Sequence, residues 1–350
     1  MALEVDIKKR LPGFTLEVRL KAEDEIVGLL GASGSGKSMT LKCVAGVETP
    51  DEGVILLNGR PLFDSDRNIN LPPQKRRVGY LFQSAALFPN MTVAQNILCV
   101  LKDKAPRAEK RRVVEDVLRR LGLEGLGDRY PAELSGGQRQ RAALARILVT
   151  KPDIIMLDEP FSALDAYLRW QLEQEMRLVL RDFGGTSLFV SHDRDEVYRL
   201  CDSIAVLSGG RVAAAGDKWA IFNNPESFAA CQLTGCKNIS PARTAGENAV
   251  FAEDWGVTLR IQTPPREPVR YVGIRAHDLE PCRGGDGPNA FPCEVVEALR
   301  DTFSMVFLLR LAPGAKTLRL EMSREAYKAL GGPPEYVRLP PEKLLPLTRD

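Results

Sequence analysis

The chain has 350 residues, and its 48 lysines and arginines nearly balance its 46 aspartates and glutamates, which leaves a formal net charge of +2. Hydrophobic residues make up 44% and charged residues 27% of the sequence, the balance of a globular protein of roughly two domains. These values argue against a strongly basic nucleic-acid-binding chain, and no apolar run approaches the roughly 18 residues of a membrane span.

Short apolar runs alternate with amphipathic segments over the first 230 residues or so. Strand-like runs occupy residues 25–31, 153–159, 186–193 and 203–216, and several end in glycine or aspartate. The charged segment 107–123 has apolar residues at helical spacing and a glycine near its end. Strands alternating with helices predict an α/β domain with a largely parallel sheet covered by helices.

The amino-acid composition changes after about residue 235, where proline and glycine become frequent. Short alternating segments, such as 304–311 and 316–322, lie between turn signals at nearly regular spacing. This pattern predicts a small all-β barrel or sandwich. We therefore expect two domains, covering residues 1–232 and 233–350, with a helical part of the first domain at about 84–150.

Residues 31–38, GASGSGKS, match the phosphate-loop pattern G-x-x-x-x-G-K-[ST]. They follow an apolar strand and open a helical segment, so backbone N–H groups can surround phosphate at a helix N-terminus. A plain glycine-rich turn would not need the Lys-Ser pair. We expect Lys37 to reach the β- and γ-phosphates and the Ser38 hydroxyl to ligate Mg²⁺. The predicted nucleotide-binding residues of this loop are Gly31, Ser33, Gly34, Ser35, Gly36, Lys37, Ser38 and Met39.

Two further groups of residues are candidates for catalysing hydrolysis. The strand 154–160 ends in Asp158, predicted on the Mg²⁺ side, and Glu159, a candidate general base. On its own, this pair of carboxylates could be only an acidic turn after a strand, but beside a phosphate loop it predicts an active site. His192 follows another strand at the sheet edge where ligands bind in parallel sheets, so we favour a γ-phosphate role over a structural one. His277 is expected to cap or pack against something local.

The segment 134–146, LSGGQRQRAALAR, is a second candidate anion site. Ser135 is a suitable N-cap for the helix that follows, which explains the serine alone. Gly136 and Gly137 lose entropy on folding unless their backbone closely approaches another group, and a helix N-terminus favours an anion.

The phosphate loop, LSGGQ, LDEP, SALD and SHD follow one another in an order that resembles the ATPase subunit of an ABC transporter, over residues 1 to about 230. The resemblance implies ATP and Mg²⁺ as cofactors and a head-to-tail homodimer. It implies Glu159 as the base, His192 as the γ-phosphate contact, and Gln83, in YLFQ, as a sensor of Mg²⁺ and water. The Mg²⁺ residues are then Ser38, Gln83 and Asp158, and the residues acting on the partner's nucleotide are Ser135, Gly136, Gly137, Gln138 and Asp165. Phe14 is the candidate for stacking on adenine.

The resemblance extends to the C-terminal region, which looks like the oligonucleotide-binding-like TOBE domain of importer ATPases. Segments 234–240 and 272–280 resemble molybdate- and sulfate-type importers, which implies a molybdate (or tungstate) importer. Alternatives are an importer for sulfate, iron or another solute, a soluble ABC ATPase acting on DNA or ribosomes, and an oxyanion-sensor role for the C-terminal region. Weak oxyanion-binding candidates are Lys237, Asn238 and Ser240, which a solvated linker also explains.

The expected partners follow from the same resemblance. Residues 82–97 are rich in apolar side chains and are expected to contact membrane permease subunits, although ordinary core packing would also account for them. A periplasmic or extracellular solute-binding protein would take part indirectly, and no nucleic acid is expected. The first residues lack a secretory-signal pattern, and the seven cysteines form no C-x-x-C pair, which favours reduced thiols. We therefore expect a peripheral protein on the cytoplasmic face of the membrane.

Overall fold

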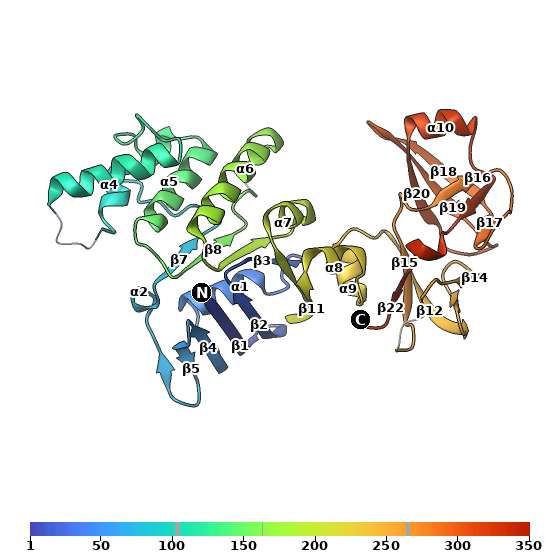
Figure 1. Ribbon diagram of the computed structural model, residues 1–350, viewed down its shortest axis with the longest axis horizontal. Coiled ribbons are helices and arrows are strands. Elements are labelled where there is room, and N and C mark those ends of the chain that lie inside the picture. The colour runs from blue at the N-terminus through green and yellow to red at the C-terminus, as the bar shows by residue number, and fades with distance from the viewer. Residues whose placement is uncertain (102–105, 163, 264–266) are drawn as a thin grey trace. The chain divides into compact units, whose positions relative to one another are not determined.

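The computed structural model describes residues 1–101, 106–162, 164–263 and 267–350. The chain forms two compact units, Met1–Lys218 and Trp219–Asp350 (Figure 1). The second unit includes helix α9 (Phe228–Leu233), which the sequence had assigned to the first domain. The α9 ring of Phe228 packs against Tyr271 of the second unit, with centroids 4.9 Å apart, which accounts for this difference. Within the described residues, no helix is long and apolar enough to cross a membrane.

Five strands at one side of the first unit's sheet run parallel, in the order β10-β3-β9-β8-β7. Every residue of β3, β8 and β9 is buried, as expected for parallel strands covered on both faces. The strand bounds are β3 Ile26–Gly31, β7 Val78–Leu81, β8 Ile154–Asp158, β9 Ser187–Ser191 and β10 Ser203–Ser208.

The other side of this sheet is antiparallel apart from a short parallel pairing of β11 with β2, so the prediction of a largely parallel sheet was wrong for this part of the unit. Strands β1 and β2 form a long hairpin, and β4, β5 and β6 continue from β1. Buried and less buried residues alternate along β2, the pattern of a strand with one covered face. The bounds are β1 Ala2–Leu11, β2 Phe14–Glu23, β4 Glu52–Leu57, β5 Arg60–Asp64, β6 Ile69–Asn70 and β11 Arg211–Asp217.

Helices connect the parallel strands and place the candidate site residues. The predicted helix at 107–123 is α4, which buries Val114, Val117 and Leu118 and is followed by Gly122 with φ +61°. Helices α3, α4 and α5 all lie between β7 and β8 in the chain, where the helical part of the domain was expected. The bounds are α1 Lys37–Ala45, α2 Pro73–Arg76, α3 Val93–Leu98, α4 Arg107–Arg120, η1 Pro131–Glu133, α5 Gly136–Leu148, α6 Ala166–Phe183 and α7 Arg194–Leu200.

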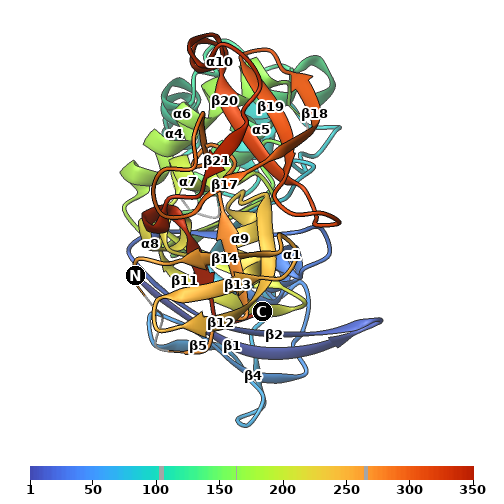
Figure 2. The same cartoon turned by 90° about the vertical axis from the view of Figure 1, so that its right-hand side faces the viewer.

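The second unit is built mainly from antiparallel strands (Figure 2). Its three sheets have the orders β14-β13-β12-β15-β22, β16-β21-β17 and β18-β19-β20. Trp255, Phe307 and Leu309 are buried in its core. The bounds are α8 Lys218–Asn223, β12 Asn238–Gly246, β13 Ala249–Ala252, β14 Val257–Arg260, β15 Tyr271–Ile274, β16 Glu280–Cys282, β17 Ala290–Pro292, β18 Glu294–Arg300, β19 Ser304–Arg310, β20 Leu318–Ser323, α10 Arg324–Leu330, β21 Tyr336–Arg338, η2 Pro341–Lys343 and β22 Leu345–Leu347.

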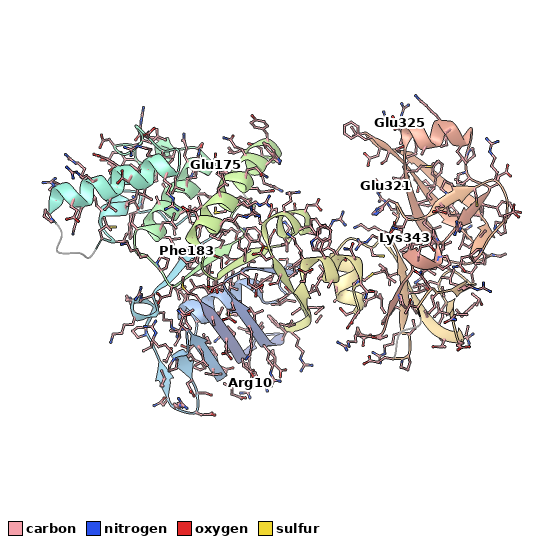
Figure 3. The ribbon with its side chains drawn as sticks, viewed as in Figure 1. Arg10, Glu175, Phe183, Glu321, Glu325 and Lys343 are labelled. Atoms are coloured by element: carbon pink, nitrogen blue, oxygen red, sulfur yellow. The ribbon has the colours of Figure 1, made fainter. Side chains whose placement is uncertain are left out.

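Charged side chains of both signs project from each unit, as Arg10 and Glu175 do in the first and Lys343 does in the second (Figure 3). Many of them are paired: Arg10 lies 2.8 Å from Glu52, and Lys343 lies 3.4 Å from Asp278. Such exposed pairs each contribute about 0–1 kcal/mol to the free energy of unfolding.

The predicted fold class, an α/β P-loop unit followed by a β unit, is confirmed by this architecture.

Candidate nucleotide-binding site

The predicted phosphate loop joins β3 to α1 in a conformation that requires glycine. Gly34 and Gly36 have φ angles of +79° and +105°, a region that side chains disfavour. A Cβ atom added to Gly31 would lie 2.5 Å from the carbonyl oxygen of Leu207, so no larger residue fits there. The loop backbone is therefore held close to its neighbours and leads directly into the N-terminus of α1.

Lys37 is the first residue of α1 and is only 5% exposed. Its Nζ atom donates to the carbonyl oxygens of Gly31, at 2.7 Å, and Ala32, at 2.9 Å, so the side chain folds back along the loop. Burial lowers the pKa of Lys37, and the carboxylates of Glu159 and Asp158 oppose that shift. The ammonium group thus lies at the loop, in the field of both predicted acidic residues.

The remaining loop residues differ in exposure. Ser33 is exposed, Ser35 is buried with an Oγ atom that has no hydrogen-bond partner, and Met39 packs against the core of the sheet. A Cβ atom added to Gly36 would lie 3.8 Å from Cε2 of Phe14, so that ring lies beside the loop. Its role in stacking on adenine stays a prediction.

Asp158, at the end of β8, links the phosphate loop to β7, the strand that pairs with β8 at the edge of the sheet. It is 6% exposed, and its Oδ1 atom accepts a hydrogen bond from Ser38 Oγ at 2.7 Å. Its Oδ2 atom accepts from the Tyr80 hydroxyl at 2.9 Å. Burial and the Asp158 carboxylate raise the pKa of Tyr80 well above its usual value, so the phenol stays a donor. A carboxylate and a hydroxyl are oxygen ligands of the kind that Mg²⁺ prefers, so the residues fit this ion.

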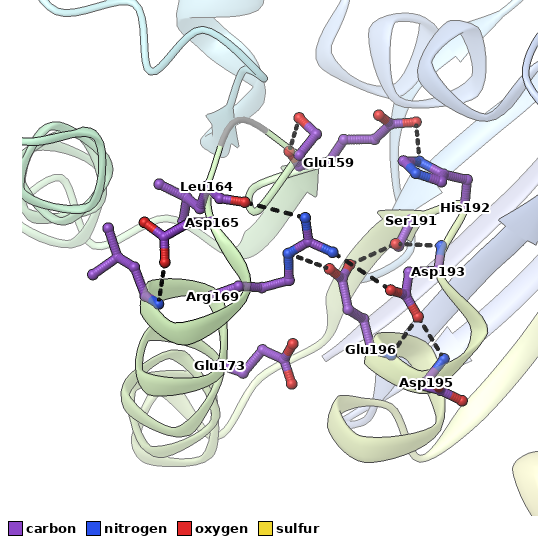
Figure 4. Close-up of polar contacts among 12 residues, drawn as sticks. Glu159, Leu164, Asp165, Arg169, Glu173, Ser191, His192, Asp193, Asp195 and Glu196 are labelled. Atoms are coloured by element: carbon purple, nitrogen blue, oxygen red, sulfur yellow. Dashed lines mark hydrogen bonds and ion pairs between the residues drawn. The ribbon is translucent and has the colours of Figure 1, made fainter. Parts of the chain in front are cut away.

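The three predicted catalytic residues meet at the same edge. Glu159 Oε1 lies 3.4 Å from His192 Nδ1, and the Gln83 Nε2 atom lies 3.4 Å from Glu159 Oε2 and 3.1 Å from Ser162 Oγ (Figure 4 shows the Glu159–His192 contact). Glu159 has a φ of +46°, which is uncommon for glutamate, and its N–H donates to the carbonyl of Val190 at 3.0 Å. Gln83, also predicted to hold Mg²⁺, contacts Glu159 rather than Ser38.

The LSGGQ segment caps helix α5. Ser135 Oγ accepts from the backbone N–H of Gln138 at 3.2 Å, and Gln138 Oε1 accepts from the Ser135 N–H at 2.9 Å. This capping box gives both residues a structural function, as the sequence allowed for the serine. In the described parts of the chain, no hydrogen bond or ion pair joins residues 135–138 to the phosphate loop.

The two glycines of this segment lie against helix α6 and the loop before it. A Cβ atom added to Gly137 would lie 2.8 Å from Cδ1 of Leu172, and one added to Gly136 would lie 3.0 Å from Cδ2 of Leu164. The close approach that the sequence led us to expect is therefore made at least partly within the chain itself.

Asp165 is exposed and is the N-cap of α6, because its Oδ1 atom accepts from the Leu168 N–H at 2.9 Å. Arg169, one turn further along α6, is a residue that the sequence analysis missed. Its Nη2 atom donates to the Leu164 carbonyl at 3.2 Å, and its guanidinium lies 3.6 Å from Asp193 and 3.8 Å from Glu196 (Figure 4). Only its helical spacing from SALD could have indicated it.

The oxyanion candidates lie in the second unit and are engaged there. The Asn238 amide exchanges hydrogen bonds of 2.9 and 2.7 Å with the backbone of Arg319, and Ser240 Oγ accepts from Asp254 N–H at 2.9 Å. Lys237 is exposed immediately before β12. Asn238 and Ser240 are thus both buried and hydrogen-bonded within the second unit. His277 is exposed, and its expected local capping or packing stays a prediction.

The apolar segment 82–97 leaves one large ring on the surface. Phe88 is 46% exposed, and the guanidinium of Arg146 lies 5.3 Å from its ring centroid. Val93 and Ile97 of the same segment are fully buried, so this stretch combines core packing with an exposed ring.

Comparisons with known proteins place the chain in a family. The family described as ABC transporter matches residues 16–162. The chain is 43% identical over 223 residues to the molybdenum import ATP-binding protein ModC of Paramagnetospirillum magneticum, covering 64% of this chain and 61% of that protein. It is 43% identical over 230 residues to the sulfate/thiosulfate import ATP-binding protein CysA of Caulobacter vibrioides, covering 64% of this chain and 66% of that one. These two matches span just under two thirds of the relatives' lengths.

A longer match and a solved structure extend the likeness. The spermidine/putrescine import ATP-binding protein PotA of Methylococcus capsulatus is 36% identical over 336 residues, which cover 93% of this chain and 84% of that protein. A dimeric post-hydrolysis structure of the ATP-binding cassette MJ0796 bound to ADP and Pi has a TM-score of 0.53 and 28% identity, covering 62% of this chain and 98% of that one. The chain therefore belongs to the ABC transporter ATPase family.

Proposed function

We propose that this chain is an ATP-hydrolysing subunit that energises a membrane importer. One observation carries the proposal: Ser38 and Asp158 meet at the edge of the parallel strands where Glu159, His192 and Gln83 also gather. That edge adjoins the phosphate loop, so one site offers phosphate binding, oxygen ligands for a divalent cation and a carboxylate base.

Nucleotide binding is assigned to the chain's own phosphate loop. The loop N–H groups and Lys37 bind the phosphates of ATP, and Phe14 stacks on the base. Ser38, Asp158 and Gln83 would hold Mg²⁺, which when bound would supply positive charge that offsets the phosphate charge. The hydrogen bond between Ser38 and Asp158 supports this assignment because it already places two of the ligands together.

Hydrolysis is assigned to Glu159 and its neighbours. The Glu159 carboxylate takes a proton from the water whose oxygen bonds to the γ-phosphorus, while the bond from that phosphorus to ADP breaks. His192 contacts the γ-phosphate, and Gln83 orients the water. Most of the catalytic effect then comes from positioning and charge rather than covalent chemistry.

A second copy of the chain completes each site. Ser135, Gly136, Gly137, Gln138 and Asp165 act on the nucleotide held by the partner, so closure of the dimer assembles the catalytic arrangement. The likeness to a dimeric cassette bound to ADP and Pi supports this arrangement.

The transport partners are membrane permease subunits, with a solute-binding protein acting indirectly from the other side. The names of all three relatives describe them as import ATP-binding proteins. The chain would then act at the cytoplasmic face of the membrane, with the exposed Phe88 ring in the surface that meets the permease.

Molybdate (or tungstate) is the solute we favour, and sulfate, iron or a polyamine are the alternatives that the relatives name. Residues 233–350 are proposed as a TOBE-type domain in which Lys237, Asn238 and Ser240 contribute to oxyanion binding. Calorimetry of the purified chain with molybdate, tungstate and sulfate tests this sensor role. Micromolar binding of one oxyanion supports it, and heats equal to buffer dilution for all three remove it without affecting the ATPase.

The ATPase itself is tested by phosphate release from ATP with and without Mg²⁺. Mg²⁺-dependent hydrolysis that Lys37→Ala abolishes supports the proposal. Absence of hydrolysis by the unmodified chain, alone and with its permease, contradicts it.

A further inference from the structure

Arg169, on the first turn of α6, contacts two segments at once. Its guanidinium binds the backbone of Leu164, just before Asp165, and the carboxylates of Asp193 and Glu196, just after His192. We propose that Arg169 is a positioning residue that couples the chain's own ATP site to the site it shares with its partner. This inference rests on the proposed function, because it uses the composite dimer described above. Figure 4 shows the guanidinium between the two loops.

The His192 side of the bridge is a closed network of hydrogen bonds. Ser191 Oγ donates to Glu196 Oε2 at 2.6 Å and accepts from the Asp193 N–H at 2.9 Å. Asp193 also caps α7, because its Oδ1 atom accepts from the N–H of Asp195 at 2.8 Å. Of the two residues flanking His192, Ser191 is bonded to the Glu196 carboxylate and Asp193 carries a carboxylate of its own, and Arg169 contacts both carboxylates.

The other side of the bridge is the backbone before Asp165. The Leu164 carbonyl accepts from Arg169 Nη2 at 3.2 Å, and the Leu164 side chain is only 7% exposed and lies against Gly136. A displacement of the guanidinium therefore reaches both partner-facing segments, Asp165 directly along the chain and Gly136 through packing.

The chemistry of the side chain suits this task. A guanidinium is planar and presents several N–H groups in fixed directions, so it can serve two loops at once, whereas a lysine ammonium cannot reproduce that geometry. The Glu196 side chain is 5% exposed, so its attraction to Arg169 is screened less than that of a surface pair. When His192 meets the γ-phosphate of its own ATP, a shift of its loop is transmitted to the residues that face the partner's ATP.

The consequence that an experiment can measure is cooperativity between the two ATP sites. We expect hydrolysis by the purified chain to follow ATP concentration with a Hill coefficient approaching 2, the number of sites in the dimer. Arg169→Gln should lower the coefficient to about 1 and turnover by roughly 10-fold. ATP binding to the monomer should stay within about twofold of wild type, and Arg169→Lys should recover less than half of the coupling.

Arg199→Gln is the matched control. Arg199 on α7 contacts Glu173 on α6 at 2.7 Å, so the variant breaks a neighbouring bridge between the same helices and leaves Glu173, 2% exposed, without it. It touches neither the His192 loop nor Leu164. We expect Arg199→Gln to keep the wild-type Hill coefficient while lowering thermal stability as much as Arg169→Gln does.

A double variant keeps the test valid if loss of Arg169 unfolds the chain. Arg169→Met combined with Glu196→Gln removes both charges and should also give a Hill coefficient near 1. A wild-type coefficient of 1, wild-type cooperativity in a folded Arg169 variant, or equal loss in Arg199→Gln overturns the inference while leaving the ATPase in place. Absence of hydrolysis in wild type defeats the proposed function instead.

Discussion

The side chains of Glu159 and His192 face each other, with Oε1 and Nδ1 3.4 Å apart, although helix α6 lies between these two residues in the chain. They meet because β8 and β9 are adjacent parallel strands whose carboxyl ends share one edge. Glu159 is 22% exposed and His192 60% exposed, so a water molecule and a phosphate can reach both. The arrangement places the proposed base and the proposed phosphate contact side by side.

Gly31→Ala should weaken nucleotide binding as well as reduce stability. The added Cβ atom would lie 2.5 Å from both the Leu207 carbonyl oxygen and Ser35 Oγ, so the loop backbone must move. We expect the Kd for ATP to rise at least 10-fold by calorimetry. Gly284→Ala is the control, because its nearest atom would be 3.9 Å away; equal ATP affinity in both variants would show that the loop tolerates the shift.

Ser135→Arg should stop turnover while the monomer binds ATP normally. The arginine would obstruct the partner's nucleotide, and loss of the cap should lower the free energy of unfolding by about 1 kcal/mol. Phosphate release and calorimetry of ATP binding separate the two effects. Thr92→Arg removes the equivalent capping box of α3 and should keep most of its activity. If Ser135→Arg instead loses monomer binding, the loop serves its own chain.

Glu196→Gln should raise the melting temperature near pH 7. Burial raises the pKa of Glu196 above its ordinary value of 4.5, with further contributions from Asp193 and Glu173, so the folded state disfavours the charged form. The stability that this group contributes is present below pH 4.5 and is lost as pH rises through the folded-state pKa. The advantage of the glutamine variant should therefore grow with pH in thermal melts. A constant difference from pH 4 to pH 8 would contradict the assignment.

The motifs and the parallel strands that carry them could be predicted from sequence because their signals are local. Gly31, Asp158 and His192 lie at or just after the ends of short, mostly apolar runs, and such a run predicts a buried strand whose end lies at the sheet edge. The helix at 107–120 likewise carries its own apolar stripe and glycine stop.

The antiparallel half of the sheet and the Arg169 bridge could not be predicted. Strand β11 pairs antiparallel with β10 and joins the antiparallel strands by a short parallel pairing with β2 through Arg211 and Glu17, which lie nearly 200 residues apart. Arg169 looks like any surface arginine of an amphipathic helix until α7 is placed beside it. Both features depend on long-range packing, which leaves no periodic signal in the sequence.

The central claim is that two chains close around ATP and that Glu159 performs the hydrolytic step. The most direct test is light scattering of Glu159→Gln with ATP, alongside a phosphate-release assay. The neutral amide keeps the shape of the side chain but cannot accept the proton, so we predict an ATP-dependent dimer with hydrolysis lowered at least 100-fold, and a monomer with ADP. Hydrolysis at the wild-type rate, or a chain that stays monomeric at saturating ATP, would contradict the account.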